Sequence, residues 1–247
     1  MFSYRVGGSR PPRPQVFVTG GTGYLGRRVV RALLERQADV TVLVRPRTDY
    51  RAALGPFANQ VDVVIGDACN LGSLNGRARG HFCVIHLVGG RGRDPVHGFT
   101  NRHLNYTSTR TVAAMAAGDG VKRFVYLSNA GLPPWLSDFS DSKNMAEKYL
   151  QRSGLAWLII RAPRLVGGER RHTLLSYPMR VFRYVPLLDR LAPLLVGIAA
   201  RGIAALALDP QAYYHIYYGP DLRRLGRPPA QPRPAPPQLP PGQPYRQ

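Results

Sequence analysis

The sequence predicts a doubly wound α/β fold built on a parallel sheet, and three observations support it. Short apolar runs rich in β-branched residues alternate along the chain with segments of helical periodicity. The runs are apolar throughout, as in strands that helices cover on both faces. A glycine-rich segment directly follows the first run and precedes the first helical segment. Crossovers between parallel strands are right-handed, so we expect helices on both faces of one sheet.

Each element is predicted from its own pattern. Strands are expected where four to six apolar residues stand together: Val16–Thr19, Val40–Val44, Val61–Ile65, Cys83–Val88, Phe124–Ser128 and Ala156–Ile160. Helices are expected where apolar residues recur every three or four positions: Gly26–Arg36, Leu104–Ala117 and Lys143–Arg152. Further along, a helix over Ala199–Leu208 and a strand over Tyr214–Tyr218 are predicted.

The charge balance restricts the partners. The chain has 34 Lys and Arg against 14 Asp and Glu, a net charge of +20, and only three of the cations are lysines. Such an excess attracts anions, namely a nucleotide, a nucleic acid or an anionic membrane surface. No basic helix with interleaved aromatic residues is present, so nucleic acid is the least favoured partner.

Other classes of protein are disfavoured. No apolar run reaches the ~20 residues that span a bilayer, and no secretory signal is predicted. Two cysteines, Cys69 and Cys83, are too few for a disulfide framework and are expected to be buried structural thiols. Four histidines between residues 81 and 103 share no helical face, so no metal site is predicted. We expect a cytoplasmic protein, with a possible place at the periphery of a membrane complex.

The glycine-rich segment Thr19–Gly26 reads TGGTGYLG and lies between a predicted strand and a predicted helix. In this context the first glycine permits a tight turn, the second admits a pyrophosphate, and the third lets the helix pack closely. The amino end of the helix then attracts the phosphates. This pattern predicts a Rossmann-type dinucleotide site. Its expected contacts are Gly20, Thr22, Gly23, Tyr24, Leu25 and Gly26.

The end of the second strand predicts which dinucleotide binds. An acid there would hold a ribose 2′-hydroxyl, but the strand ends in Val44-Arg45-Pro46-Arg47. Because a guanidinium suits a 2′-phosphate, Arg45, helped by Arg47, favours NADP(H) over NAD(H). The alternative is that both residues only reflect an arginine-rich composition.

Several motifs resemble the extended and atypical short-chain dehydrogenase/reductase superfamily, in its NmrA-like branch. They are the glycine loop, Gly66-Asp67 after the third strand, and His86-Leu87-Val88-Gly89-Gly90 at the end of the fourth. Segments 121–128 (VKRFVYLS) and 154–163 (GLAWLIIRAP) resemble two further signatures. The likeness covers about residues 15–225, and the branch includes relatives of the nucleotide-binding accessory subunit of respiratory complex I.

The resemblance implies further cofactor contacts. Asp67 and Ala68 would lie at the adenine, and Lys143 would hold the ribose. The backbone of Leu87, Val88 and Gly89 would pass near the nicotinamide ribose. Asn105 would help to order the site, and Pro163 would flank the nicotinamide.

The catalytic pattern of the superfamily is broken in this chain. The reaction uses a tyrosine four residues before the lysine, and the position four before Lys143 is Phe139, which has no proton to give. The assisting serine is also altered, because the pair after the fifth strand is Ser128-Asn129. Lys143, Asn129 and Ser128 remain the candidate catalytic residues. A shift of register by one residue would bring Ser140 near the missing hydroxyl.

The chain divides into four predicted parts. Residues 1–14 are a flexible basic leader, 15–165 the dinucleotide-binding domain, 166–225 a small C-terminal lobe of the same unit, and 226–247 a proline-rich tail. Residues 179–208 mix apolar residues with arginines. They form either part of that lobe, which we favour, or an interfacial helix on an anionic membrane.

The sequence therefore favours an NADP(H)-binding protein without the usual tyrosine chemistry. Its expected role is that of an accessory or redox-sensing subunit of a larger assembly. The alternative is an active NADPH-dependent reductase or isomerase acting on a small carbonyl or quinone, with Asn129 or water serving the substrate oxygen.

Overall fold

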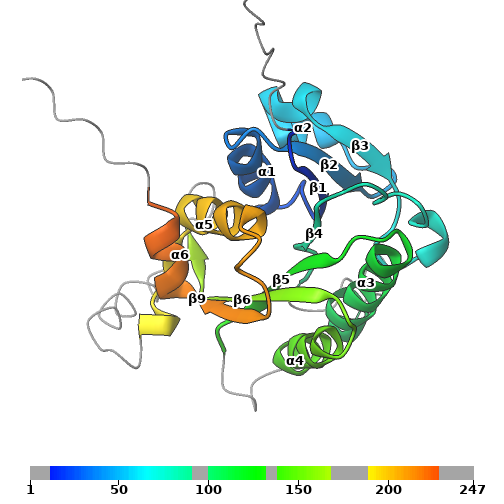
Figure 1. Ribbon diagram of the computed structural model, residues 1–247. Coiled ribbons are helices and arrows are strands. Elements are labelled where there is room, and N and C mark those ends of the chain that lie inside the picture. The colour runs from blue at the N-terminus through cyan, green and yellow to red at the C-terminus, as the bar shows by residue number, and fades with distance from the viewer. Residues whose placement is uncertain (1–11, 91–99, 132–137, 168–188, 228–247) are drawn as a thin grey trace, which may run out of the picture.

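The computed structural model describes residues 12–90, 100–131, 138–167 and 189–227 (Figure 1). A seven-stranded sheet forms the centre, and every pair of neighbours in the order β3-β2-β1-β4-β5-β6-β9 is parallel. The strands are β1 (Gln15–Thr19), β2 (Asp39–Val44), β3 (Asp62–Ile65), β4 (Cys83–His86), β5 (Arg123–Asn129), β6 (Ala156–Ala162) and β9 (His215–Tyr218). The predicted Rossmann-type α/β fold is confirmed.

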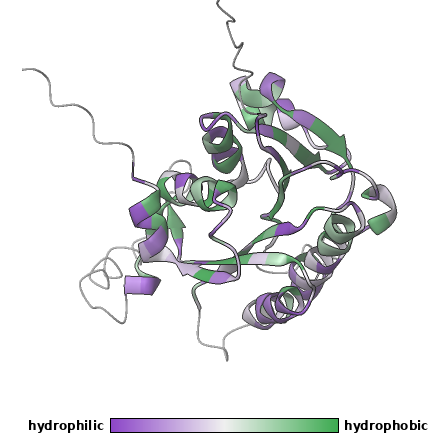
Figure 2. Cartoon of the chain, in the orientation of Figure 1, coloured by the Kyte–Doolittle hydropathy of each residue, from purple (hydrophilic) through white to green (hydrophobic). Residues whose placement is uncertain are grey.

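Helices cover both faces of the sheet (Figure 1). One face carries α1 (Gly26–Leu34) and α5 (Val196–Leu208), and the other carries α3 (Ser108–Gly118) and α4 (Asp138–Gln151). Along β1, Val16 and Val18 face the first layer and Phe17 faces the second, as the two-residue period of a strand requires. Apolar residues therefore line both faces of the sheet. Its strands are accordingly coloured largely as hydrophobic (Figure 2).

Short elements complete the described residues. Two short helices are α2 (Tyr50–Leu54) and α6 (Gly219–Leu225), and 3₁₀ turns span Gly55–Gln60, Leu71–Ser73 and Asp189–Leu191. A two-stranded sheet pairs β7 (Leu165–Val166) with β8 (Leu194–Leu195). A turn of π-helix, His103–Thr107, directly precedes α3.

The structure corrects several predicted boundaries. Helix α4 begins at Asp138, five residues before the predicted start at Lys143, because the polar residues ahead of the lysine have no apolar periodicity to reveal them. Strand β4 ends at His86, so Leu87 and Val88 lie in the loop that follows. The helix predicted from Leu104 begins as the π turn, and the helix predicted from Ala199 begins at Val196.

Helix α5 bears on the two interpretations of residues 179–208. Its residues are largely buried against the sheet and against α1. The part from Val196 onward is therefore core, and the interfacial-helix alternative is wrong for it. Residues 179–188, most of the leader and nearly all of the proline-rich tail lie outside the described residues. In the described ranges, no helix is long and apolar enough to cross a membrane.

Candidate functional site

The glycine loop connects β1 to α1 in a conformation that needs glycine at two positions. Gly20 has a φ of +76°, and an added Cβ would lie 3.0 Å from the backbone nitrogen of Val88. A Cβ on Gly26 would lie 2.0 Å from the carbonyl oxygen of Gly20, so a side chain would push α1 away from the loop. The amino end of α1 is thus held against the loop, where its N–H groups and dipole favour a phosphate.

This loop lies at the point where the sheet reverses its strand order, because β1 stands between β2 and β4. Ligands of open α/β sheets bind at the carboxyl ends of the strands at such a point. The N–H of Gly66 donates to the carbonyl oxygen of Val44 (3.0 Å), which brings Asp67 to the same edge as Arg45. The carboxylate of Asp67 accepts from the backbone N–H of Cys69 (2.9 Å).

Cys69 departs from its predicted environment. Its thiol is half-buried rather than buried, whereas Cys83 on β4 is fully enclosed as predicted. Burial and the charge of Asp67 raise the pKa of Cys69 to about 11. Burial likewise raises the pKa of Cys83 to about 12, so neither thiol is poised as a nucleophile near neutral pH.

Three segments that lie far apart in the sequence meet at Lys143. Its amine donates to the carbonyl oxygen of Leu127 (2.8 Å). An added Cβ on Gly89 would lie 2.8 Å both from this amine and from the Oδ1 of Asn105. Asn105 is fully buried, and its amide donates to the hydroxyl of Ser142 (3.0 Å). The loop after β4, the π turn and α4 therefore converge where the resemblance expects the nicotinamide ribose.

The electrostatics of this region follow from burial. Lys143 is 4% exposed, and desolvation lowers its pKa to about 7, against the opposing influence of the Glu147 carboxylate. Burial also lowers the pKa of His86 to about 3, with a smaller contribution from the charge of Lys143. His86 is therefore neutral near pH 7, and it bridges the hydroxyls of Thr19 (2.7 Å) and Ser108 (3.1 Å).

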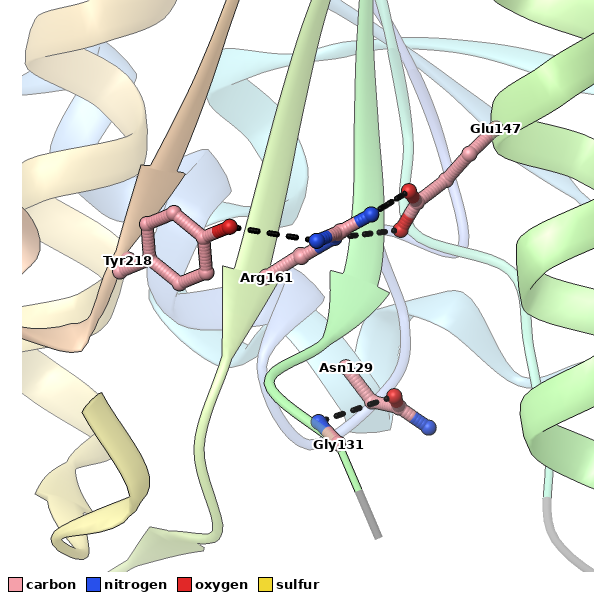
Figure 3. Close-up of polar contacts among 5 residues, drawn as sticks. All are labelled: Asn129, Gly131, Glu147, Arg161 and Tyr218. Carbon is pink, nitrogen blue, oxygen red and sulfur yellow. Dashed lines mark hydrogen bonds and ion pairs between the residues drawn. The ribbon is translucent and has the colours of Figure 1, made fainter. Parts of the chain in front are cut away.

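Unsatisfied polar atoms gather at the carboxyl end of β5 and in the first turn of α4. Asn129 accepts from the N–H of Gly131 (3.2 Å; Figure 3), but its buried Nδ2 has no hydrogen-bond partner in the described chain. The same is true of the hydroxyls of Ser128 and Ser140. Buried polar groups normally have hydrogen-bond partners, so these three groups can form hydrogen bonds with the oxygen atoms of a ligand. Phe139, beside Ser140, contributes no hydroxyl.

An ion pair that the sequence did not predict joins β6 to α4 (Figure 3). The guanidinium of Arg161 donates to both carboxylate oxygens of Glu147, with a shortest distance of 2.6 Å. Its remaining amine donates to the hydroxyl of Tyr218 (3.1 Å). Glu147 is the first cause of the raised pKa of Arg161. Pro163 follows β6 and is buried near Gly219, at the same edge of the sheet.

The predicted site residues thus gather at one edge of the sheet, and their contacts with a cofactor stay predictions. Sequence reasoning missed His86 as a polar bridge and Arg161 as the partner of Glu147. The one sequence signal for the role of His86 is its position as a polar residue at the end of an apolar run. Among the described residues, no three His, Cys, Asp or Glu side chains are arranged to hold a metal ion.

Comparison with known proteins defines the class. Residues 20–181 match the model of a family described as NAD(P)H-binding, and the chain belongs to this family. Its place in the atypical short-chain dehydrogenase/reductase, NmrA-like superfamily is confirmed.

Two curated relatives have different roles. The chain is 31% identical over 204 residues to ceramide reductase of Caulobacter vibrioides, covering 80% of this chain and 62% of that protein. It is 28% identical over 156 residues to Photosystem II assembly factor Ycf39 of Synechocystis, covering 62% of this chain and 46% of that protein. The chain therefore spans less than two thirds of either relative.

A solved structure supports the fold. DesIV, a dTDP-glucose 4,6-dehydratase from Streptomyces venezuelae with NAD and TYD bound, superimposes with a TM-score of 0.65 at 24% identity. The match covers 83% of this chain and 75% of that protein.

Proposed function

We propose that this chain binds NADP(H) and acts as an accessory or redox-sensing subunit of a larger assembly, without tyrosine-dependent carbonyl reduction. The observation that carries the proposal is that Phe139 lies four residues before Lys143 in the first turns of α4. The lysine that would hold the ribose is kept, whereas the acid that would protonate a substrate oxygen is absent. Binding is therefore retained in a site that lacks the proton donor of the reaction.

The residues fit a nicotinamide dinucleotide. The glycine loop holds the amino end of α1 close to the end of β1, because a Cβ on Gly20 or Gly26 would strike backbone atoms. This close approach supports binding of a pyrophosphate at the amino end of α1. Arg45 lies exposed at the carboxyl end of β2, and no carboxylate of the described residues forms an ion pair with it. A free guanidinium at this position supports the preference for a 2′-phosphate.

The similarity to an assembly factor supports the accessory role, because that relative is named for assembly and not for a reaction. The net charge of +20 favours an acidic protein partner or an anionic membrane surface as the site of assembly.

A second candidate is an active NADPH-dependent reductase. The unpartnered atoms of Ser128, Asn129 and Ser140 favour it, and one relative is named as a reductase. A bound NADPH would supply the hydride, and these side chains would hold the acceptor oxygen by hydrogen bonds. None of them is an acid near pH 7, so the substrate would take its proton from water.

Calorimetry with NADPH and NADH, followed by a turnover assay on aldehydes, ketones and quinones, tests the proposal. We expect NADPH to bind roughly ten- to a hundredfold more tightly, the value of one charge-assisted contact to the phosphate. An Arg45→Ala variant should lose this preference and keep its affinity for NADH. Equal affinities in the native protein, or rapid native turnover, would contradict the proposal.

A further inference from the structure

Arginines gather on the outer side of α6, near the end of the described chain. Among the described residues, a hollow of about 360 Å³ is lined by Asp189, Pro220, Arg223, Arg224 and Arg227. The neighbouring Leu222 is fully buried and packs against α5. Helix α6 therefore turns its apolar side to α5 and its basic side to the hollow.

The element that carries these cations is held firmly by the fold. A Cβ on Gly202 would lie 2.9 Å from the carbonyl oxygen of Leu222, and a Cβ on Gly226 would lie 2.0 Å from that of Ile198. Helices α5 and α6 therefore pack closely side by side (Figure 1). Arg201 donates to the carbonyl oxygen of Gly226 (2.7 Å), which closes the end of α6. Because this surface is already ordered, a partner that binds to it loses little affinity to ordering.

The fold uses one arginine of the hollow and leaves two without a close partner. The guanidinium of Arg223 donates to the carboxylate of Asp189 and to two backbone carbonyl oxygens (3.1 and 3.0 Å). The side chain of Arg224 is 74% exposed, and its ion pair with Asp221 is 4.0 Å long. Arg227 is exposed and forms no ion pair with a carboxylate of the described residues.

The C-terminal third of the chain has few acids that could neutralise these two cations. From residue 164 to residue 247 the sequence has twelve arginines against four acids, namely Glu169, Asp189, Asp209 and Asp221. Asp189 pairs with Arg223, and Asp221 accepts from the backbone N–H of Tyr218 (3.0 Å). Charge complementarity therefore indicates that another molecule supplies the anionic groups.

The mixed lining of the hollow favours an acidic peptide over an anionic lipid surface. Arg224 and Arg227 offer only hydrogen-bond donors, whereas the carboxylate of Asp189 accepts hydrogen bonds. An acidic peptide matches both, because its carboxylates pair with guanidinium groups and its backbone N–H groups donate to a carboxylate. A lipid phosphate has acceptors alone. Binding in a membrane interface also depends on buried apolar area, and the described lining contains no large apolar side chain.

We propose that the hollow beside α6 is a docking site for an acidic segment of a partner protein, whose carboxylates pair with Arg224 and Arg227. The inference rests on the proposed accessory role and names the surface through which the chain joins a larger assembly. None of the residues that line the hollow is a predicted cofactor contact. The docking site can therefore be changed without altering the dinucleotide site.

The test measures the anisotropy of a fluorescent oligoglutamate peptide added to the full chain at low ionic strength. Replacing Arg224 and Arg227 together by glutamine should weaken binding by at least about tenfold, because charge-assisted contacts are lost. The matched control replaces Arg36 and Arg110 by glutamine, since both are exposed on other elements. It removes the same charge and should weaken binding by less than about twofold. Both double variants should bind NADPH as tightly as the native protein does.

The possible outcomes separate this inference from the proposed function. Equal weakening in the two double variants would show a diffuse attraction to the net charge and would overturn the docking site. Binding to phosphatidylserine vesicles that requires Arg224 and Arg227, without binding of the peptide, would assign the hollow to a membrane surface instead. If the native protein binds NADPH no more tightly than NADH, or reduces carbonyl substrates rapidly, the proposed function fails whatever the peptide measurements give.

Discussion

The guanidinium of Arg161 on β6 donates hydrogen bonds to both carboxylate oxygens of Glu147, which lies one turn beyond Lys143 on α4. The same guanidinium donates to Tyr218 at the end of β9. The pair therefore ties the helix that carries the candidate site to two adjacent strands of the sheet. Glu147 is almost fully buried, whereas a third of the Arg161 side chain reaches solvent.

Replacing Glu147 by glutamine should destabilise the fold by about 1–3 kcal/mol, because a buried guanidinium contact loses its charged partner. The partial exposure of Arg161 lets water compensate for some of the loss. Urea unfolding measures the change. The control is Glu35→Gln, which breaks the exposed Arg31–Glu35 pair (2.8 Å) and should cost at most about 0.5 kcal/mol. Equal effects of the two substitutions would refute a special role for the buried pair.

Replacing Phe139 by tyrosine should create carbonyl-reductase activity where the native protein has little. The new phenol would lie four residues before Lys143, whose amine can lower its pKa. A positioned acid contributes about 10²–10⁴-fold in rate, so a gain of at least tenfold in NADPH oxidation is expected. The gain should vanish when Lys143→Met is added. Robust native turnover that survives removal of Ser128 and Asn129 together would contradict this view of the site.

Lys143 should be held in the site at a cost to stability. Its pKa is about 7 in the fold against 10.5 for a free lysine, so between these values the unfolded chain binds a proton that the folded chain lacks. The free energy of unfolding should therefore rise from pH 7 to pH 10, by up to about 1.4 kcal/mol per unit.

A Lys143→Met variant should lack this rise and bind NADPH about tenfold more weakly, as expected from the loss of one hydrogen bond to the cofactor. Chemical unfolding at several pH values, set beside calorimetry, measures both effects. A variant with the same slope as the native protein would show that the amine is not the titrating group.

His86 should make the fold sensitive to mild acid. Its pKa is about 3 in the fold against 6.5 in an unfolded chain, so below pH 6.5 the unfolded state binds a proton that the folded state excludes. Stability should fall as the pH drops from 6.5 to 4.5, a window above most carboxylate titrations. A His86→Gln variant should show a smaller fall over this window, whatever its stability at pH 7. An unchanged slope would assign the loss to other groups.

Local sequence patterns predicted most of the fold. Buried parallel strands are apolar along their whole length, so β1 through β6 could be predicted from the sequence. The glycine loop marks the start of the first helix. The start of α4 could not be predicted, because the polar run before Lys143 contains no apolar repeat, and this part of the helix contacts the distant π turn through Ser142 and Asn105. The π turn before α3 also leaves no pattern in the sequence.

The candidate site could be predicted only where one short segment carries it. The glycine loop and Arg45 each lie in one stretch of chain. The meeting of Gly89, Asn105 and Lys143 depends on three segments that the sheet brings together, and only the family resemblance pointed to it. The left-handed backbone conformation of Arg47, with a φ of +64°, could not be predicted, since a proline followed by an arginine is not a signal for it.

The contact between α1 and α5 has a consequence for how the chain is made. Helix α1, at residues 26–34, is covered by a helix that ends at Leu208, and β6 gains its outer neighbour only at His215–Tyr218. While the ribosome is still adding those residues, the apolar side of α1 and the edge of β6 stay open to other chains. Early termination before α5 would therefore yield a fragment that aggregates, and a chaperone that binds apolar surface is best placed to act on this nascent chain before its last strand emerges.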